Sequence, residues 1–183
     1  DKMHDGFGYV TANSLDEVDP KKIAMDGVNE ALSKIGAKSV PSGDYKVIIN
    51  NDAMVSLLST FAGVFSADAV QKGLSLLKDK EGEDIASSIV NLVDDPHLKN
   101  GLASVGFDDE GVATRKTYLI KDGKLDSFLH NLKTANKAGV KSTGNGFKNS
   151  YASPISVSPT NFYFEPGNKE FDELVSTIDE GII

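Results

Sequence analysis

The stretch TRKTYLIKDGKLDSFLH, residues 114–130, decides the fold class of this chain. Two runs that favour β-strands, residues 114–121 and 124–130, flank the dipeptide Asp122-Gly123. Because glycine relieves the positive-φ requirement of a type I′ turn, Asp-Gly between two such runs predicts an antiparallel hairpin. The sheet is therefore expected to contain at least one antiparallel pair of strands.

Outside the hairpin, the sequence predicts a mixture of helices and strands. Apolar residues at helical spacing predict helices over residues 19–35, 52–72, 132–138 and 169–179. Runs of β-prone residues predict strands over residues 7–11, 45–50, 88–93 and 161–165, with another entered at 181–183. This mixture lacks regular βαβ alternation. It predicts a single α+β domain over residues 1–183, with helices packed on a mixed or mainly antiparallel sheet.

Local signals place the ends of two helices and the burial of one strand. Asp19 before a proline predicts a helix N-terminus, and Gly139 predicts the end of the helix over 132–138. The strand over 45–50 contains Val47, Ile48 and Ile49 in succession, so we expect it to be buried on both faces.

Composition excludes several classes of protein. The chain has 183 residues, no cysteine, and a net charge of −8 from 27 acidic and 19 basic residues. Without cysteine there is no thiolate nucleophile, cysteine-bound zinc or redox pair, and the absence agrees with a reducing compartment. The longest apolar stretch, residues 53–65, is interrupted by serine and threonine and is too short to cross a bilayer. We therefore expect a cytoplasmic protein that does not enter a membrane.

The acidic charge also argues against direct binding of nucleic acid, which requires cationic groups that displace counterions from phosphates. Lysines do gather between Lys133 and Lys148, with Phe147 and Tyr151 nearby. We interpret this run as a solvated loop and not as a nucleic-acid interface.

Few residues have the pattern of a catalytic or metal site. The histidines, His4, His97 and His130, are not followed by glutamate and share no helical spacing, so we interpret them as solvated or hydrogen-bonded side chains. The acidic run 108–110 is expected to point into water, and the pair 94–95 before a proline is interpreted as part of a turn. The chain has neither a G-x-S-x-G nucleophile elbow nor a G-x-x-x-x-G-K-[ST] phosphate loop.

The polar loop over residues 142–146 is a candidate for ligand binding. We name Thr143, Gly144 and Asn145 as candidate peptide-binding residues, because such a loop can offer backbone N–H groups to an anion or a peptide carboxylate. The composition of the loop favours the alternative, a flexible connector.

Five segments in a fixed order carry a family resemblance. They are GLAS (101–104), FDDEGVAT (107–114), LIKDGKL (119–125), KSTGNG (141–146) and PTNFYFEPG (159–167). Together they resemble the TldD/PmbA family, bacterial and archaeal proteins labelled modulators of DNA gyrase and grouped with metalloproteases. The resemblance covers residues 40–183. Family members are longer at both ends, which implies that this chain is a central part without the N-terminal domain and the final β-rich portion.

The resemblance also implies a lost metal site. In TldD-type members, the helix after the strand equivalent to 45–50 carries H-E-x-x-x-H, which supplies two zinc ligands and a general-base glutamate. Here Ser59 and Thr60 stand where the first His and the Glu would be, and Val64 stands where the second His would be. The family's further cysteine ligand has no counterpart in a chain without cysteine. This pattern resembles the PmbA branch, so we expect no metal or other cofactor.

For function, the resemblance implies a non-catalytic companion subunit of a zinc peptidase. Its partner would be a metal-bearing TldD-type subunit, or a second copy of itself. Its substrates would be small or unfolded polypeptides, such as peptide-antibiotic precursors and antitoxins, held in a groove by strand addition. Two alternatives stay open: a metal-independent enzyme whose catalytic residues are not identified, and a non-proteolytic protein that binds gyrase or its inhibitors. Whether this chain has enzymatic activity is therefore left open.

Overall fold

The computed structural model describes residues 3–182. The chain forms two compact units, one up to Tyr45 and one from Lys46 onward. The sheet and the helices packed on it belong to the second unit. The predicted α+β class with a mainly antiparallel sheet is confirmed.

The first unit is built around helix α1, Pro20–Ser33, which follows the short 3-10 helix η1, Leu15–Glu17. Asp19 caps α1 as predicted. Its Oδ1 accepts hydrogen bonds from the backbone N–H groups of Lys21 (2.9 Å) and Lys22 (3.2 Å), which have no partner within the helix.

An extended segment, residues 6–8, lies directly against α1. A Cβ on Gly8 would be 2.0 Å from the carbonyl oxygen of Ile23, so this close approach requires glycine. The strand predicted over residues 7–11 is wrong, because this segment pairs with no strand among the described residues. Alternating aromatic residues can mark an extended chain without a sheet partner.

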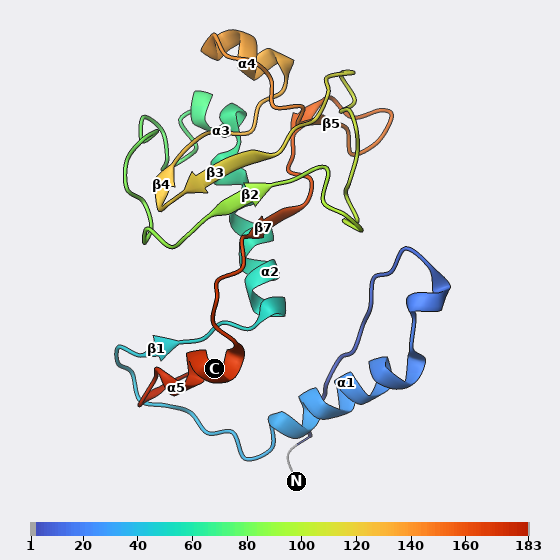
Figure 1. The fold of residues 1–183 in the computed structure, drawn as a ribbon, viewed down its shortest axis with the longest axis vertical. Helices are drawn as coiled ribbons and strands as arrows, with labels where there is room; N and C mark the ends of the chain where they lie inside the picture. The colour runs from blue at the N-terminus through green and yellow to red at the C-terminus, as the bar shows by residue number, and fades with distance from the viewer. Residues whose placement is uncertain (1–2, 183) are drawn as a thin grey trace. The chain divides into compact units, whose positions relative to one another are not determined.

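The main sheet of the second unit is antiparallel throughout and has the strand order β4-β3-β2-β7 (Figure 1). Its strands are β2 (Leu92–Asp94), β3 (Thr117–Lys121), β4 (Lys124–Leu125) and β7 (Phe162–Phe164). The predicted hairpin is confirmed as β3–β4. At its turn Asp122 (φ 49°) and Gly123 (φ 80°) both have positive φ, as a type I′ turn requires.

Two smaller strand pairs lie outside the main sheet. One is antiparallel and the other is parallel; their strands are β5 (Gly146–Phe147) with β6 (Ser156–Val157), and β1 (Lys46–Val47) with β8 (Gly181–Ile182). The burial predicted for the strand over 45–50 is wrong. Val47 is 55% exposed, because β1 pairs only with β8 in the described part of the chain and is not covered on both faces.

The long helix predicted over residues 52–72 is divided into three. Its parts are α2 (Asn51–Phe61), the 3-10 helix η2 (Ala62–Phe65) and α3 (Ala67–Gln71). The break between η2 and α3 falls at Ser66, whose backbone is extended. There the N–H of Ala67 donates to the carbonyl of Leu129 (3.0 Å), and the N–H of Leu129 donates to the carbonyl of Phe65 (2.9 Å). These long-range bonds replace helical ones.

The core lies between this helical run and the main sheet. It is made of side chains from η2, α3, β2, the hairpin and the residues after it: Phe65, Ala67, Leu92, Leu119, Ile120, Leu125, Phe128 and Leu129.

Helix α4, Leu132–Ala138, has the predicted bounds and ends at Gly139 (φ 71°). Helix α5 spans Phe171–Ser176. Within residues 3–182, no helix is long and apolar enough to span a membrane.

Candidate functional site

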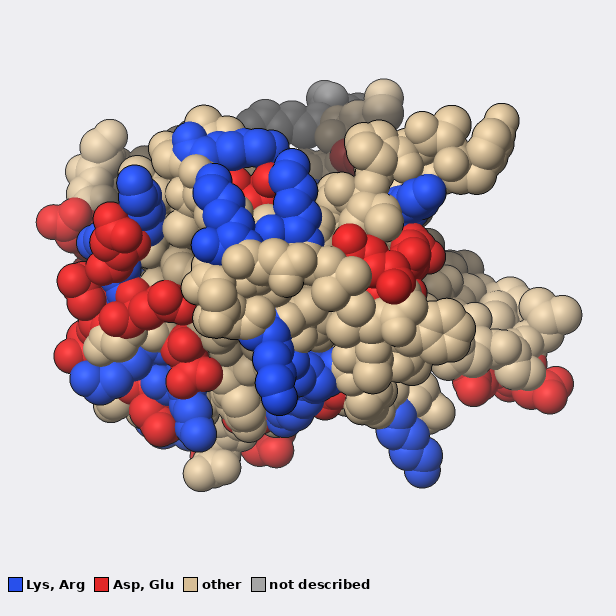
Figure 2. Space-filling view, turned by 90° about the horizontal axis from the view of Figure 1, so that it is seen from above, with Lys and Arg blue, Asp and Glu red and all other residues tan. Residues whose placement is uncertain are grey.

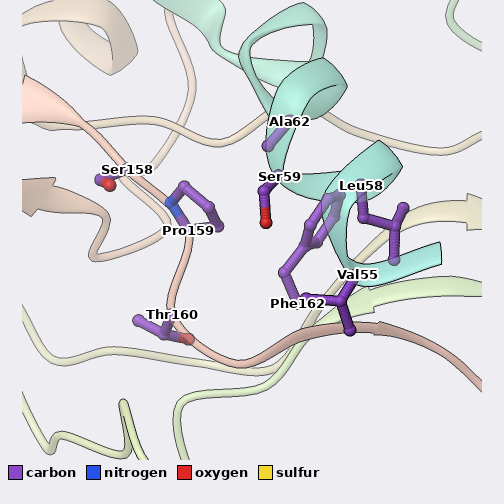
Figure 3. A pocket seen from close by; sticks show the side chains of 8 residues that line it. All are labelled: Val55, Leu58, Ser59, Ala62, Ser158, Pro159, Thr160 and Phe162. Carbon is purple, nitrogen blue, oxygen red and sulfur yellow. The ribbon is translucent and has the colours of Figure 1, made fainter. Parts of the chain in front are cut away.

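A hollow of about 370 Å³ lies between helix α2 and the segment that enters β7. Figure 3 shows α2 on one side and residues 158–162 on the other. Its walls are mainly apolar, with three hydroxyl groups and no charged group: Val55, Leu58, Ser59, Ala62, Ser158, Pro159, Thr160 and Phe162. Such walls suit an uncharged, partly apolar group.

The three positions of the degenerate metal motif do not act together. Ser59 lines the hollow from α2. Thr60 is exposed, and its Oγ1 donates to the carbonyl oxygen of Ser56 (2.8 Å). Val64 packs against the hydrophobic core. Only one of the three side chains therefore borders the hollow.

The donors on α2 do not fit a catalytic metal, which needs about three ligands from His, Asp, Glu or Cys. The histidines lie elsewhere. The Nε2 of His97 is 3.2 Å from Thr114 Oγ1, and the Nδ1 of buried His130 is 3.2 Å from Thr134 Oγ1. Burial lowers the pKa of His130. Among residues 3–182, no three His, Asp or Glu side chains form a group that could hold a metal ion.

Behind the hollow lies a fully buried carboxyl group, that of Asp94 at the end of β2. Its Oδ1 accepts hydrogen bonds from Thr160 N (2.6 Å) and Thr160 Oγ1 (2.9 Å), and its Oδ2 accepts one from Asn145 Nδ2 (2.7 Å). The interpretation of the pair 94–95 as turn residues is therefore wrong for Asp94. The sequence showed no signal for this role, because the partners stand 51 and 66 residues away.

The loop over residues 142–146 is buried and ordered by hydrogen bonds, so its interpretation as a flexible connector is wrong. Asn145 is its centre. Besides Asp94, Asn145 Nδ2 bonds the carbonyl of Ser158 (3.1 Å), and Asn145 O accepts from Ser158 N (3.0 Å). Thr143 Oγ1 lies 2.6 Å from Asn145 Oδ1 and orients the amide.

The backbone N–H groups of this loop already have partners inside the protein. Gly144 N donates to Ser142 Oγ (3.2 Å), and Asn145 N donates to the carbonyl of His130 (3.2 Å). Thr143, Gly144 and Asn145 thus lie behind the wall of the hollow and not on the surface. A role for them in peptide binding stays a prediction, and it would act through the residues that they hold.

The acidic run 108–110 does not point into water as a group. Asp108 is buried, and it accepts hydrogen bonds from Val112 N (2.9 Å) and Gly146 N (2.9 Å). The expectation is therefore wrong for Asp108. Glu110 accepts from the N–H of Leu132. These carboxyl groups connect loops to each other and do not form an acid–base pair.

The lysines between residues 133 and 148 are exposed, as a solvated run predicts, although the loop among them is buried. They are Lys133, Lys137, Lys141 and Lys148. Figure 2 shows Lys and Arg side chains interspersed with Asp and Glu on the face that it draws. Mixed charge of this kind is typical of a solvated surface.

The pH dependence of stability provides a test of the Asp94 environment. Burial raises the pKa of Asp94, although hydrogen bonds from Asn145 and Thr160 act in the opposite direction. A group with a raised pKa in the folded state contributes stability that is complete below the unfolded pKa and is lost as pH rises through the folded pKa. We expect the unfolding free energy of the wild type, relative to that of Asp94→Asn, to be largest below pH ~4 and to fall at higher pH. Urea unfolding of both proteins over a pH series measures this difference, and a difference that grows with pH contradicts the expectation.

Comparisons with known proteins agree with the fold and the segments described above. The family model "PmbA/TldA metallopeptidase C-terminal domain" matches residues 42–183. A metalloprotease of Methanocaldococcus jannaschii is 35% identical over 180 residues, which cover 97% of this chain and 38% of that protein.

Two solved structures are also similar. A Thermotoga maritima protein, described as a candidate modulator of a DNA gyrase, has 41% identity and a TM-score of 0.87, over 93% of this chain and 39% of its own. TldE from Thermococcus kodakarensis has 30% identity and a TM-score of 0.74, over 91% of this chain and 38% of its own. The chain therefore spans less than half the length of each of these relatives. On this evidence, the chain belongs to the PmbA/TldD family of metallopeptidase-related proteins.

Proposed function

We propose that this chain belongs to a non-catalytic companion subunit of a TldD/PmbA-type zinc peptidase. It would help to bind small or unfolded polypeptides, including peptide-antibiotic precursors and antitoxins, for a metal-bearing TldD-type partner in the cytoplasm. The chemistry of α2 carries the proposal. The helix borders a hollow, yet Ser59, Thr60 and Val64 supply no imidazole or carboxylate to it.

The edge of the main sheet supports a role in binding extended polypeptides. Strand β7 pairs with β2 on one side and with no described strand on the other. The bonds from Asp95 N to Asn161 O and from Glu165 N to Asn91 O show which residues of this segment face β2. In an antiparallel pair the intervening residues face away. Phe162 and Phe164 therefore direct their N–H and C=O groups to the free edge.

A polypeptide paired with this edge would pass the hollow, because Phe162 belongs both to β7 and to the lining. Main-chain hydrogen bonds would supply affinity without sequence preference, and the uncharged hollow would select apolar or small polar side chains. This division of roles suits a subunit that holds varied unfolded substrates.

The proposal is tested by purifying the full-length protein with and without a TldD-type subunit from the same cell. Each protein and the mixture are incubated with reduced, carboxymethylated lactalbumin, an unfolded polypeptide. We expect the two to co-purify, and we expect cleavage in the mixture alone. Removal of zinc by a chelator should abolish cleavage, and added zinc should restore it, because the metal resides in the partner.

Three outcomes contradict the proposal. Cleavage by this protein alone would make it a metal-independent enzyme. Co-purification with gyrase, with no cleavage in any mixture, would favour the non-proteolytic alternative. A stable complex of this protein with itself only, which the molecular mass of the purified complex reveals, would exclude the heteromeric partner.

A further inference from the structure

We infer that Asp94 is a positioning residue for the hollow: through Thr160 and Asn145 it fixes the wall formed by residues 158–160 opposite helix α2. The wall's use in binding polypeptide rests on the proposed function. The positioning itself rests on contacts within this chain.

The wall has no secondary structure of its own to hold it. It lies between β6, which ends at Val157, and β7, which begins at Phe162. Pro159 has no N–H to donate. The wall is held instead at two points, Ser158 and Thr160, and both are bonded by side chains that lie behind the hollow.

Asp94 joins these two points. One carboxylate oxygen accepts both donors of Thr160, and the other accepts from Asn145 Nδ2 (2.7 Å). The same Asn145 amide bonds the carbonyl of Ser158 (3.1 Å). The carboxylate thus sets the position of Thr160 directly and that of Ser158 through Asn145.

Asparagine at position 94 cannot reproduce this arrangement. Its single oxygen can keep the two donors of Thr160, but its NH₂ group then faces the NH₂ group of Asn145. Turning the Asn145 amide over would restore that contact, but it would place the Asn145 oxygen against the carbonyl oxygen of Ser158. In the first case the contact between residues 94 and 145 becomes repulsive. In the second case Ser158 loses its side-chain bond and keeps only the backbone bond to Asn145 O.

In this arrangement the buried loop over 142–146 helps to hold the wall in place. Its residue Asn145 is 1% exposed and does not line the hollow, yet it bonds the wall through Ser158. These hydrogen bonds offset part of the cost of burying the Asp94 carboxyl group, since they oppose the effect of burial on its pKa.

This chain contains no cysteine, so a direct measurement of the wall needs only that any cysteine elsewhere in the full-length protein be replaced with serine first. Ser59→Cys and Ser158→Cys, introduced together, place one spin label on each side of the hollow. In the full-length protein we expect one narrow distance distribution with Asp94 present and a broadened or shifted one with Asp94→Asn. The matched control is Asp109→Asn, an exposed carboxylate that accepts one bond from Lys148 N and should leave the distribution unchanged.

All samples are measured well below their unfolding temperatures, so that global unfolding does not contribute. If Asp94→Asn fails to fold, Thr160→Val replaces it, because this change keeps the carboxylate and removes only the hydroxyl donor. Thr160→Val should also broaden or shift the distribution of distances between the two spin labels. An unchanged distribution in the folded variant would overturn the inference.

A second measurement separates this inference from the proposed function. In the full-length complex with its TldD-type partner, Asp94→Asn should raise KM for reduced, carboxymethylated lactalbumin by about fivefold and leave kcat unchanged. A broadened distance distribution with an unchanged KM would leave the positioning role standing and would contradict polypeptide binding at the hollow.

Discussion

Replacement of Asp94 with alanine is expected to lower the free energy of unfolding by about 3–5 kcal/mol, among the largest effects of any single substitution in the chain. The variant leaves the N–H and hydroxyl of Thr160 and one N–H of Asn145 facing a void without an acceptor. Burial prevents water from replacing the lost acceptor easily, since Asp94 is 0% exposed. Urea unfolding followed by circular dichroism measures the change as a shift of the midpoint at constant slope.

The adjacent residue provides the control. Asp95 is partly exposed, and its Oδ1 accepts a hydrogen bond from the N–H of His97 (3.0 Å). Asp95→Ala should therefore cost about 1 kcal/mol or less. If the two alanine variants lose the same free energy of unfolding, the buried hydrogen bonds of Asp94 add no more stability than the exposed one of Asp95.

Replacement of Gly144 with alanine is expected to lower the free energy of unfolding by about 3 kcal/mol or more. Gly144 has φ +77°, and a Cβ there would be 2.7 Å from Thr114 Cα and 2.8 Å from Ala113 O. Because these are backbone atoms, they cannot rotate away as a side chain can. The loss is measured by thermal and urea unfolding.

Gly139 separates the two causes of this effect. It has a similar φ of +71°, but no heavy atom lies within 4 Å of a Cβ built on it. Gly139→Ala should therefore cost only the strain of the left-handed conformation, about 1 kcal/mol. If both variants lose the same stability, the close approach of residues 113 and 114 to Gly144 is not a determinant of the fold.

Local chemistry made several parts of the fold predictable from the sequence. The Asp122-Gly123 turn depends on two adjacent residues whose φ values are both positive. The start of α1 depends on Asp19 and the N–H groups that directly follow it, and the end of α4 depends on Gly139. In each case the interacting groups are neighbours in the chain, so their pattern is visible in the sequence.

The absence of metal donors on α2 could also be predicted, because residue types alone decide which atoms can bind zinc. What tertiary structure decided was the surroundings of Ser59. The hollow requires residues 158–162 to lie opposite α2, about a hundred positions further along the sequence, at a distance that no local pattern encodes.

Buried polar residues show most clearly that local sequence does not reveal contacts between distant segments. Asp94 and Asn145 have the composition of a turn and a flexible loop, and both are buried. A polar side chain is stable in water or in an interior that supplies all its hydrogen bonds, and the sequence does not distinguish the two. The sequence by itself therefore determined the hairpin, the start of α1, the end of α4 and the absence of metal-binding side chains from α2. Only the tertiary structure decided which polar groups are buried, because their partners come from distant segments of the chain.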